Sequence, residues 1–167
     1  MAKPRSQREF ARTLLKKQGI MRLLELREAG VTAATMSRME RAGEVIRLSR
    51  GVYQLPDADL DPNHSLAEAA KRVPKGVVCL VSALAFHGVT DQLSPKVWMA
   101  IGPKDWAPQR SGAGIRIVRF TDGLLREGIE THVIEGVSVK VFGVAKTVAD
   151  CFRHRGIVAR IGHRTGV

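Results

Sequence analysis

The stretch from Met21 to Leu55 constrains the fold more than any other part of this sequence. Gly30 ends a first short helix, Thr32 can cap a second helix over residues 33–42, and Gly43 ends that helix in turn. A short turn therefore joins two short helices, and we predict a helix-turn-helix.

A β-hairpin is predicted directly after these helices. Residues 44–48 and 51–55 are rich in β-branched and apolar side chains, and they flank a turn at Ser49-Arg50-Gly51. Helices followed by such a hairpin have the order of a winged helix-turn-helix, whose second helix fits the major groove of duplex DNA. Helices over residues 6–18 and 20–29 complete the predicted module.

The helix over residues 33–42 has an apolar side and a basic side. Met36 and Met39 share the apolar side, whereas Arg38 and Arg41 fall opposite them. Arginine can make a bidentate contact to guanine, and a hydroxyl can bond base edges or phosphates. The predicted groove-entering residues are Thr35, Ser37, Arg38 and Arg41.

The alternative interpretation is that Arg38 and Arg41 are solvated charges paired with Glu40 or Glu44. We favour DNA because residues 1–55 hold twelve Lys and Arg against five Asp and Glu, in a chain of net charge +11. A basic excess placed on a helix-turn-helix favours a polyanionic partner.

The hairpin repeats the basic pattern, since Arg47 and Arg50 lie near its tip, where a wing reaches phosphates or a minor groove. Arg8 and Arg12, on the helix over residues 6–18, are further candidates for phosphate contacts. A solvated helix face explains these last two nearly as well.

The predicted fold class is α+β, with a linker near residues 56–62, which are acidic and bounded by prolines. A winged-helix DNA-binding domain is predicted over residues 1–58 and a small mixed α+β domain over residues 62–167. In the second domain we expect strands over residues 77–81, 96–101, 115–120, 130–134 and 137–142, and helices over residues 65–73, 82–87 and 144–154. Residues 77–81 could also belong to a helix entry, and Ser65 and Glu68 form a predicted capping box.

The sequence predicts no catalytic residue, no metal site and no cofactor. The acidic run at residues 57–61 lacks the Gly and the terminal Glu of a calcium loop, and no phosphate-cradling Gly-Lys loop occurs. His87 has no identified nucleophile beside it, so a capping or packing role is the better interpretation. Asp150 could be catalytic, but we expect it to bond Arg153 or a neighbouring loop.

Cys79 and Cys151 lie in apolar surroundings without zinc-ligand spacing, which favours reduced core thiols in a cytoplasmic protein. No run of 18 apolar residues occurs, so no membrane association is expected.

Three segments together resemble one family: RLSRGVYQL at residues 47–55, SALAFHGVTD at residues 82–91 and KTVADCFR at residues 146–153. The family is that of the AbiEi antitoxins, the transcriptional-repressor half of bacterial abortive-infection (type IV) toxin–antitoxin systems, which serve in phage defence. The resemblance extends from about Arg12 to Arg155.

The resemblance implies an N-terminal winged helix that binds inverted repeats in the promoter of its own operon. It also implies a C-terminal α+β domain that counteracts a nucleotidyltransferase-like toxin without a stable direct complex. Residues 35–41 and 47–50 match the recognition helix and the wing of the family. Similar proteins continue with further helix where residues 156–167 have weak helical character, so we expect a shortened C-terminal domain.

Two other functions remain open from the sequence. The second domain could be nuclease-like, although no Glu-x-Lys follows a suitable Asp. The basic face could instead bind an acidic protein partner.

Overall fold

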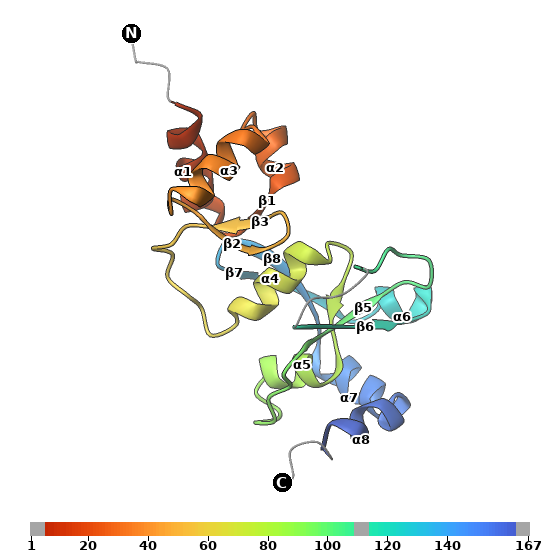
Figure 1. Cartoon of the computed structure of the whole chain (residues 1–167). Coiled ribbons are helices and arrows are strands. Elements are labelled where there is room, and N and C mark those ends of the chain that lie inside the picture. The colour runs from red at the N-terminus through yellow and green to blue at the C-terminus, as the bar shows by residue number, and fades with distance from the viewer. Residues whose placement is uncertain (1–5, 109–113, 163–167) are drawn as a thin grey trace. The chain divides into compact units, whose positions relative to one another are not determined.

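The structure is a computed structural model that describes residues 6–108 and 114–162 (Figure 1). The chain divides into two compact units. Among the described residues, the first comprises residues 6–72 together with Val133–Val137, and the second comprises residues 73–108, 114–132 and 138–162. The predicted α+β fold class, a winged helix-turn-helix followed by a mixed α+β part, is confirmed.

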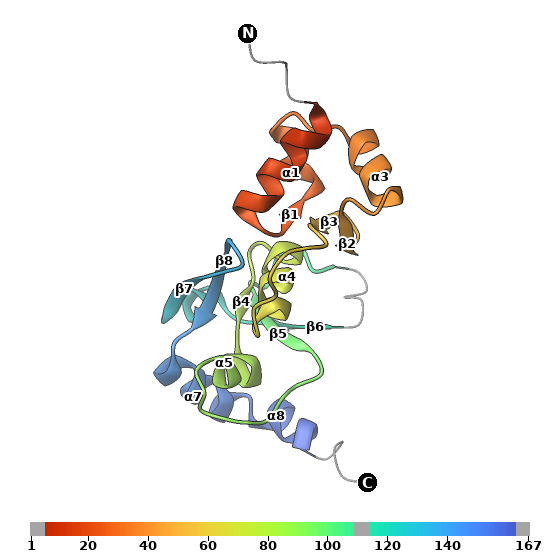
Figure 2. The same cartoon turned by 90° about the vertical axis from the view of Figure 1, so that its left-hand side faces the viewer.

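The first unit contains four helices and a three-stranded sheet among its described residues. They are α1 (Gln7–Gln18), β1 (Met21–Arg22), α2 (Leu23–Glu28), α3 (Ala33–Arg41), β2 (Ile46–Ser49), β3 (Val52–Gln54) and α4 (His64–Arg72). The sheet order is β1-β3-β2, with antiparallel pairing throughout. In both views α1 and α3 lie on the same side of this sheet (Figures 1 and 2).

Local sequence signals explain where α1 and α3 begin. The Ser6 hydroxyl accepts from the backbone N–H of Glu9 at 3.2 Å, and the Glu9 carboxylate accepts from the N–H of Ser6 at 3.1 Å. Thr32 caps α3 by accepting from the N–H of Thr35. The apolar sides of both helices then pack into one core. Its buried members include Ala11, Leu15, Leu26, Met36, Met39 and Tyr53.

The predicted helix over residues 20–29 is wrong at its start. Met21 and Arg22 form strand β1 by pairing with Tyr53 and Val52, and α2 begins only at Leu23. A strand of two residues has no periodicity of its own, because the hairpin far along the chain supplies its hydrogen-bond partners. The predicted capping box at Ser65 is also wrong, since α4 begins one residue earlier.

A tight turn at Glu135 and Gly136 completes the first unit. The Glu135 carboxylate accepts from the amide of Gln54 at 3.0 Å and from the backbone N–H of Asp61 at 2.6 Å, and its Oε2 lies 2.8 Å from Nδ1 of His64. A Cβ at Gly136 would lie 2.6 Å from the carbonyl oxygen at the end of α1. The turn thus needs glycine where it approaches the backbone of that helix.

The second unit is built around a five-stranded mixed sheet with the order β6-β5-β4-β8-β7. Its elements are β4 (Val77–Val78), α5 (Leu80–Phe86), β5 (Val97–Ile101), β6 (Ile115–Arg119), α6 (Asp122–Arg126), β7 (Ile129–Ile134), β8 (Val137–Phe142), α7 (Val144–Arg153) and α8 (Arg155–Gly162). Helices α5, α7 and α8 lie on one side of the sheet in both views (Figures 1 and 2).

The expected strands and the closing helix are confirmed to within a residue or so, and residues 77–81 divide between β4 and the start of α5. Val137, Val139 and Val141 are buried and alternate with exposed residues, as a strand with one covered face requires. Helices α6 and α8 were not predicted. The weak helical character assigned to residues 156–167 underestimated α8, in which Ile157 and Val158 pack on the core of the second unit.

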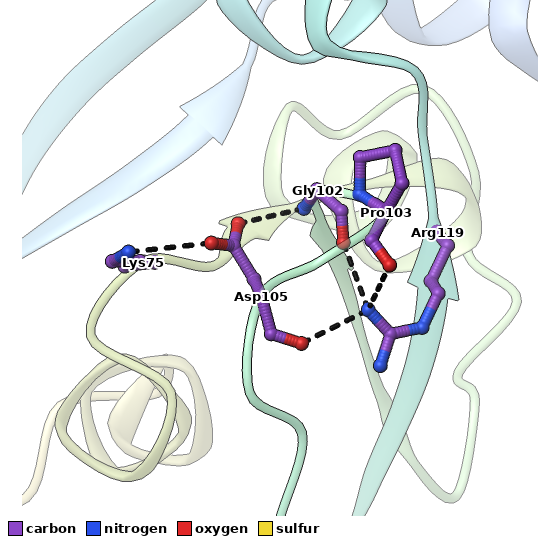
Figure 3. Close-up of polar contacts among 5 residues, drawn as sticks. All are labelled: Lys75, Gly102, Pro103, Asp105 and Arg119. Atoms are coloured by element: carbon purple, nitrogen blue, oxygen red, sulfur yellow. Dashed lines mark hydrogen bonds and ion pairs between the residues drawn. The ribbon is translucent and has the colours of Figure 1, made fainter.

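The loop after β5 is held by a side chain of the neighbouring strand β6 (Figure 3). Nη1 of Arg119 donates to the carbonyl oxygens of Gly102, Pro103 and Asp105 at 2.9, 3.1 and 2.9 Å. The Asp105 carboxylate accepts from the N–H of Gly102 at 2.9 Å and from Lys75 at 3.3 Å. These bonds, the backbone one foremost, lower the pKa of Asp105 below its usual value.

The division between compact units falls after Arg72, because α4 packs with the first unit. One reason is an ion pair in which Nζ of Lys71 lies 2.8 Å from the carboxylate of Glu25 on α2. Burial would raise the pKa of Glu25, but the bonds from Lys71 and from the Arg22 backbone lower it. The predicted domain limits, 1–58 and 62–167, stay a prediction about independent folding.

Candidate nucleic-acid interface

Helix α3 presents its arginines to solvent and its methionines to the core. Met36 and Met39 are completely buried, while Arg38 and Arg41 are exposed. The predicted division of this helix into two sides is therefore confirmed. An exposed arginine pair on the second helix of a helix-turn-helix has the position from which base edges are read.

The β2–β3 hairpin adds a second pair of exposed guanidinium groups. Arg47 lies on β2, and Arg50 lies in the turn between the strands. The turn is tied back to the helices, since the carbonyl oxygen of Gly51 accepts from the N–H of Leu23 at 2.7 Å. We call the exposed groups of Arg38, Arg41, Arg47 and Arg50 the α3–wing face.

The ion pairs of the alternative interpretation do not form within residues 6–108 and 114–162. Nη2 of Arg38 donates to the hydroxyl of Thr35 at 3.4 Å, and Nη2 of Arg41 donates to the hydroxyl of Ser37 at 3.3 Å. Glu44 pairs instead with Arg8, at 3.3 Å. Both α3 arginines therefore keep most of their donors available to an incoming acceptor.

Thr35 requires a correction. The prediction counted it among the residues that enter the major groove, but it is only 2% exposed. Its hydroxyl donates to Oε1 of Gln7 at 2.6 Å, so that hydrogen is already used inside the protein. The sequence could not show this, because the acceptor lies on α1. Ser37, in contrast, is partly exposed and remains a candidate for a groove contact.

The two candidates on α1 are both exposed. Arg8 is engaged by Glu44 across the surface, an exposed pair whose contribution to stability is about 0–1 kcal/mol, so a phosphate can compete for it. Arg12 lies one turn further along the same helix and remains a prediction without a distinguishing contact.

The residues weighed for catalysis in the second unit have structural partners. His87 follows α5 as its C-cap residue, and its Nε2 lies 2.9 Å from the carbonyl oxygen of Phe142. Asp150 is 1% exposed and pairs with Arg153 at 3.6 Å, as expected, and with Lys146 at 2.7 Å, which sequence reasoning missed. The spacing of four residues on one helix could have revealed the Lys146 pair.

The surroundings of the two thiols do not favour reactivity either. Burial raises the pKa of Cys79 well above its usual value, and it raises the pKa of Cys151 as well. Among the described residues, no group of three or more His, Cys, Asp or Glu side chains has the arrangement of a metal site. In the same part of the chain, no helix has the length and apolar character needed to cross a membrane.

Residues 9–56 match the family model described as a transcriptional regulator, AbiEi antitoxin. The match is confined to this segment of the chain. The match runs from α1 to the end of the wing, so it confirms the AbiEi resemblance where the α3–wing face lies. A search among curated proteins found no match. The similarity to a transcriptional regulator therefore concerns the winged helix-turn-helix.

Proposed function

We propose that this chain is a sequence-specific DNA-binding antitoxin that represses its own toxin–antitoxin operon. The observation that carries the proposal is the α3–wing face: two arginines project from the second helix of an AbiEi-type winged helix, and two more project from the wing. Basic groups on both elements are what a winged helix needs to bind duplex DNA.

The contacts divide into two kinds. Arg38, Arg41 and Ser37 enter the major groove, where arginine discriminates guanine by about 1–3 kcal/mol per bidentate contact. Arg47 and Arg50 contact phosphates or the minor groove beside it, and the exposed Arg8 and Arg12 of α1 add phosphate contacts. Two copies of the chain then occupy the two halves of an inverted repeat, which mirrors their twofold symmetry. No cofactor takes part.

A binding titration tests this division of roles. The purified chain is titrated against duplex DNA from upstream of its own gene and against a shuffled duplex, at several salt concentrations. Arg38→Ala weakens binding to the upstream duplex by roughly 1–3 kcal/mol and leaves the shuffled duplex nearly unchanged. Arg50→Ala weakens both duplexes alike and flattens the salt dependence.

The matched control is Arg126→Ala, which removes an exposed arginine from α6 in the second unit. This variant binds as the wild type does. Equal affinity of the wild type for the two duplexes contradicts sequence-specific binding, and weak binding that does not depend on salt points instead to an acidic protein partner.

The antitoxin part of the proposal needs a separate test in cells. A nucleotidyltransferase-like toxin encoded beside this gene is expressed with and without the chain, and growth is followed. The chain restores growth, yet the two proteins do not copurify. Toxicity that persists with the chain present contradicts the antitoxin assignment, and magnesium-dependent cleavage of plasmid DNA by the purified chain would favour the nuclease-like alternative.

A further inference from the structure

Gln7, the first residue of α1, holds the start of α3 with its side-chain amide. Its Oε1 accepts from the hydroxyl of Thr35 at 2.6 Å, from the hydroxyl of Thr32 at 3.1 Å and from the backbone N–H of Thr32 at 3.4 Å. Its Nε2 donates to the carbonyl oxygen of Gly30 at 3.3 Å. One side chain thus engages both ends of the turn between α2 and α3.

The partners fix the orientation of this amide. The backbone N–H of Thr32 can only donate, and the carbonyl oxygen of Gly30 can only accept, so the amide oxygen must face Thr32 and the amide nitrogen must face Gly30. The opposite orientation would place two donors together at Thr32 and two acceptors together at Gly30. The oxygen of Gln7 is therefore held toward α3.

The hydroxyl of Thr35 passes this orientation on to Arg38. A hydroxyl has one hydrogen, and the Thr35 oxygen lies 2.6 Å from the Gln7 oxygen and 2.9 Å from the Thr32 hydroxyl. The Gln7 contact is the shorter of the two, so we place the hydrogen toward Gln7, and the Thr32 hydroxyl can donate to Thr35 in turn. The Thr35 oxygen is then left as an acceptor, and Nη2 of Arg38 donates to it at 3.4 Å. The resulting chain runs from the Arg38 guanidinium through a buried hydroxyl to the Gln7 amide, and hydrogen bonds in such a series strengthen one another.

The same residues lie at the surface where DNA is proposed to bind. Gln7, Arg8, Thr35 and Arg38 line one surface hollow together with Ser6. Arginine carries several rotatable bonds, and restricting its rotamers before binding removes part of the entropy that a base contact otherwise costs. A preset guanidinium also favours one geometry at the base edge over others.

We propose that Gln7 is a positioning residue for base recognition, acting through Thr35 to orient Arg38 toward one base pair. The inference rests on the proposed function, because it assigns a role to Gln7 only if Arg38 reads a base. It predicts that Gln7 contributes to selectivity without touching DNA.

The test begins with a random duplex library, from which the full-length wild-type chain selects a consensus. Affinities are then measured for that consensus and for each of its single-base-pair variants. Arg38→Ala identifies the base pair at which Arg38 discriminates. Gln7→Leu and Thr35→Val each lower the discrimination at that same base pair by roughly threefold to tenfold, a part of what one bidentate arginine contact supplies. Discrimination at the other positions stays as in the wild type.

Three control variants separate positioning from general damage to the fold. Thr35→Ser keeps the hydroxyl and retains wild-type selectivity. Gln18→Leu makes the same change at the other end of α1, where the side chain is also exposed, and has no effect on selectivity. Gln7→Leu combined with Arg38→Ala discriminates no worse than Arg38→Ala alone, because the two residues act in one series.

The outcomes also distinguish this inference from the function on which it rests. A library from which the wild type enriches no sequence contradicts the proposed function itself. A clear consensus with unchanged selectivity in Gln7→Leu overturns only the inference, as does an equal loss of affinity on the consensus and all its variants. An additional loss of selectivity in the double variant overturns it too.

Discussion

The α3–wing face of the first unit and the α7 helix of the second use their charged residues in opposite ways. Arg38 and Arg41 project into solvent, and each donates to a hydroxyl on its own helix. On α7, Asp150 is 1% exposed and the Lys146 side chain is 13% exposed, and their ionised groups lie 2.7 Å apart. Lys146 also lies over the rings of Phe120 and Phe142.

The contrast shows that net charge alone does not mark a binding surface. In a buried pair the cost of desolvating both charges offsets much of their attraction, but removal of one partner leaves an uncompensated buried charge and lowers stability strongly. An exposed arginine without an acidic partner contributes little to stability but offers donors to a ligand. Substitutions in the two regions should therefore affect different properties.

The largest effect is expected from Lys146→Met, which leaves the Asp150 carboxylate buried with only the half-exposed Arg153 nearby. We expect the free energy of unfolding to fall by about 3–5 kcal/mol, the usual cost of breaking a buried pair from one side. Urea unfolding followed by circular dichroism measures it. Lys140→Met, at an exposed position of β8, is the control and changes stability by less than about 0.5 kcal/mol. A loss below about 1 kcal/mol would show that the pair is not a structural element.

The second effect concerns two glycines of the first unit, which also contains the α3–wing face. Gly19 ends α1 with a φ of 73°, and a Cβ there would overlap the backbone carbonyl of Glu135. Gly43 ends α3 with a φ of 71°, but a Cβ there would meet nothing within 4 Å. Gly43→Ala is expected to cost about 1–2 kcal/mol from backbone strain alone, and Gly19→Ala about 1–3 kcal/mol more from the overlap. Equal thermal unfolding midpoints for the two variants would contradict the close approach.

The third effect tests whether the exposed arginines of α3 serve binding rather than stability. Arg41→Ala on α3 is expected to leave the free energy of unfolding within about 0.5 kcal/mol of the wild type, because the side chain is exposed and makes a single hydrogen bond, to Ser37 on its own helix. It weakens specific DNA binding by roughly 1–3 kcal/mol. Denaturant unfolding and a binding titration on the same preparation check both halves. Lower stability with unchanged affinity would show that Arg41, like Lys146, contributes to folding rather than to DNA binding.

The smallest effect is a pH dependence at the loop that Arg119 holds. Hydrogen bonds from Gly102 and Lys75 lower the pKa of Asp105, so its contribution to stability is present above the unfolded value of about 3.9 and is lost as pH falls through the lower folded value. Asp105→Asn should therefore lose less stability than the wild type when the pH falls below about 4. Thermal unfolding midpoints across this range measure the difference. Parallel curves for the two proteins would show that Asp105 is not held as the structure indicates.

Much of the α3–wing face followed from local sequence signals. The Thr32 cap and the glycines bound the helix, and the spacing of Met36 and Met39 fixes which side is buried, so Arg38 and Arg41 had to point outward. The wing followed from its turn residues. The long strands of the second unit were recognisable for the same reason, since their apolar alternation is visible within a few residues.

The parts that were not predicted depend on partners far along the chain. β1 exists only because Tyr53 and Val52 pair with it. The hydroxyl of Thr35 is engaged by Gln7, which approaches from another helix and carries no motif of its own. Tertiary contacts of this kind override what a local window suggests, and they decide which hydroxyl is free to meet a ligand.

The two-residue strand β1 has one further consequence for recognition. β1 pairs with β3 of the wing and lies immediately before α2 in the chain. The hydrogen bond from the N–H of Leu23 to the carbonyl oxygen of Gly51 holds the turn of the wing beside it. These contacts tie the tip of the wing and the adjacent part of β3 to the start of α2, and so restrain the wing relative to the helix-turn-helix. The spacing between the DNA contacts of the wing and those of α3 is then set by the fold. An operator whose two contacted segments are spaced differently could be contacted by the arginines of α3 or by those of the wing, but not by both.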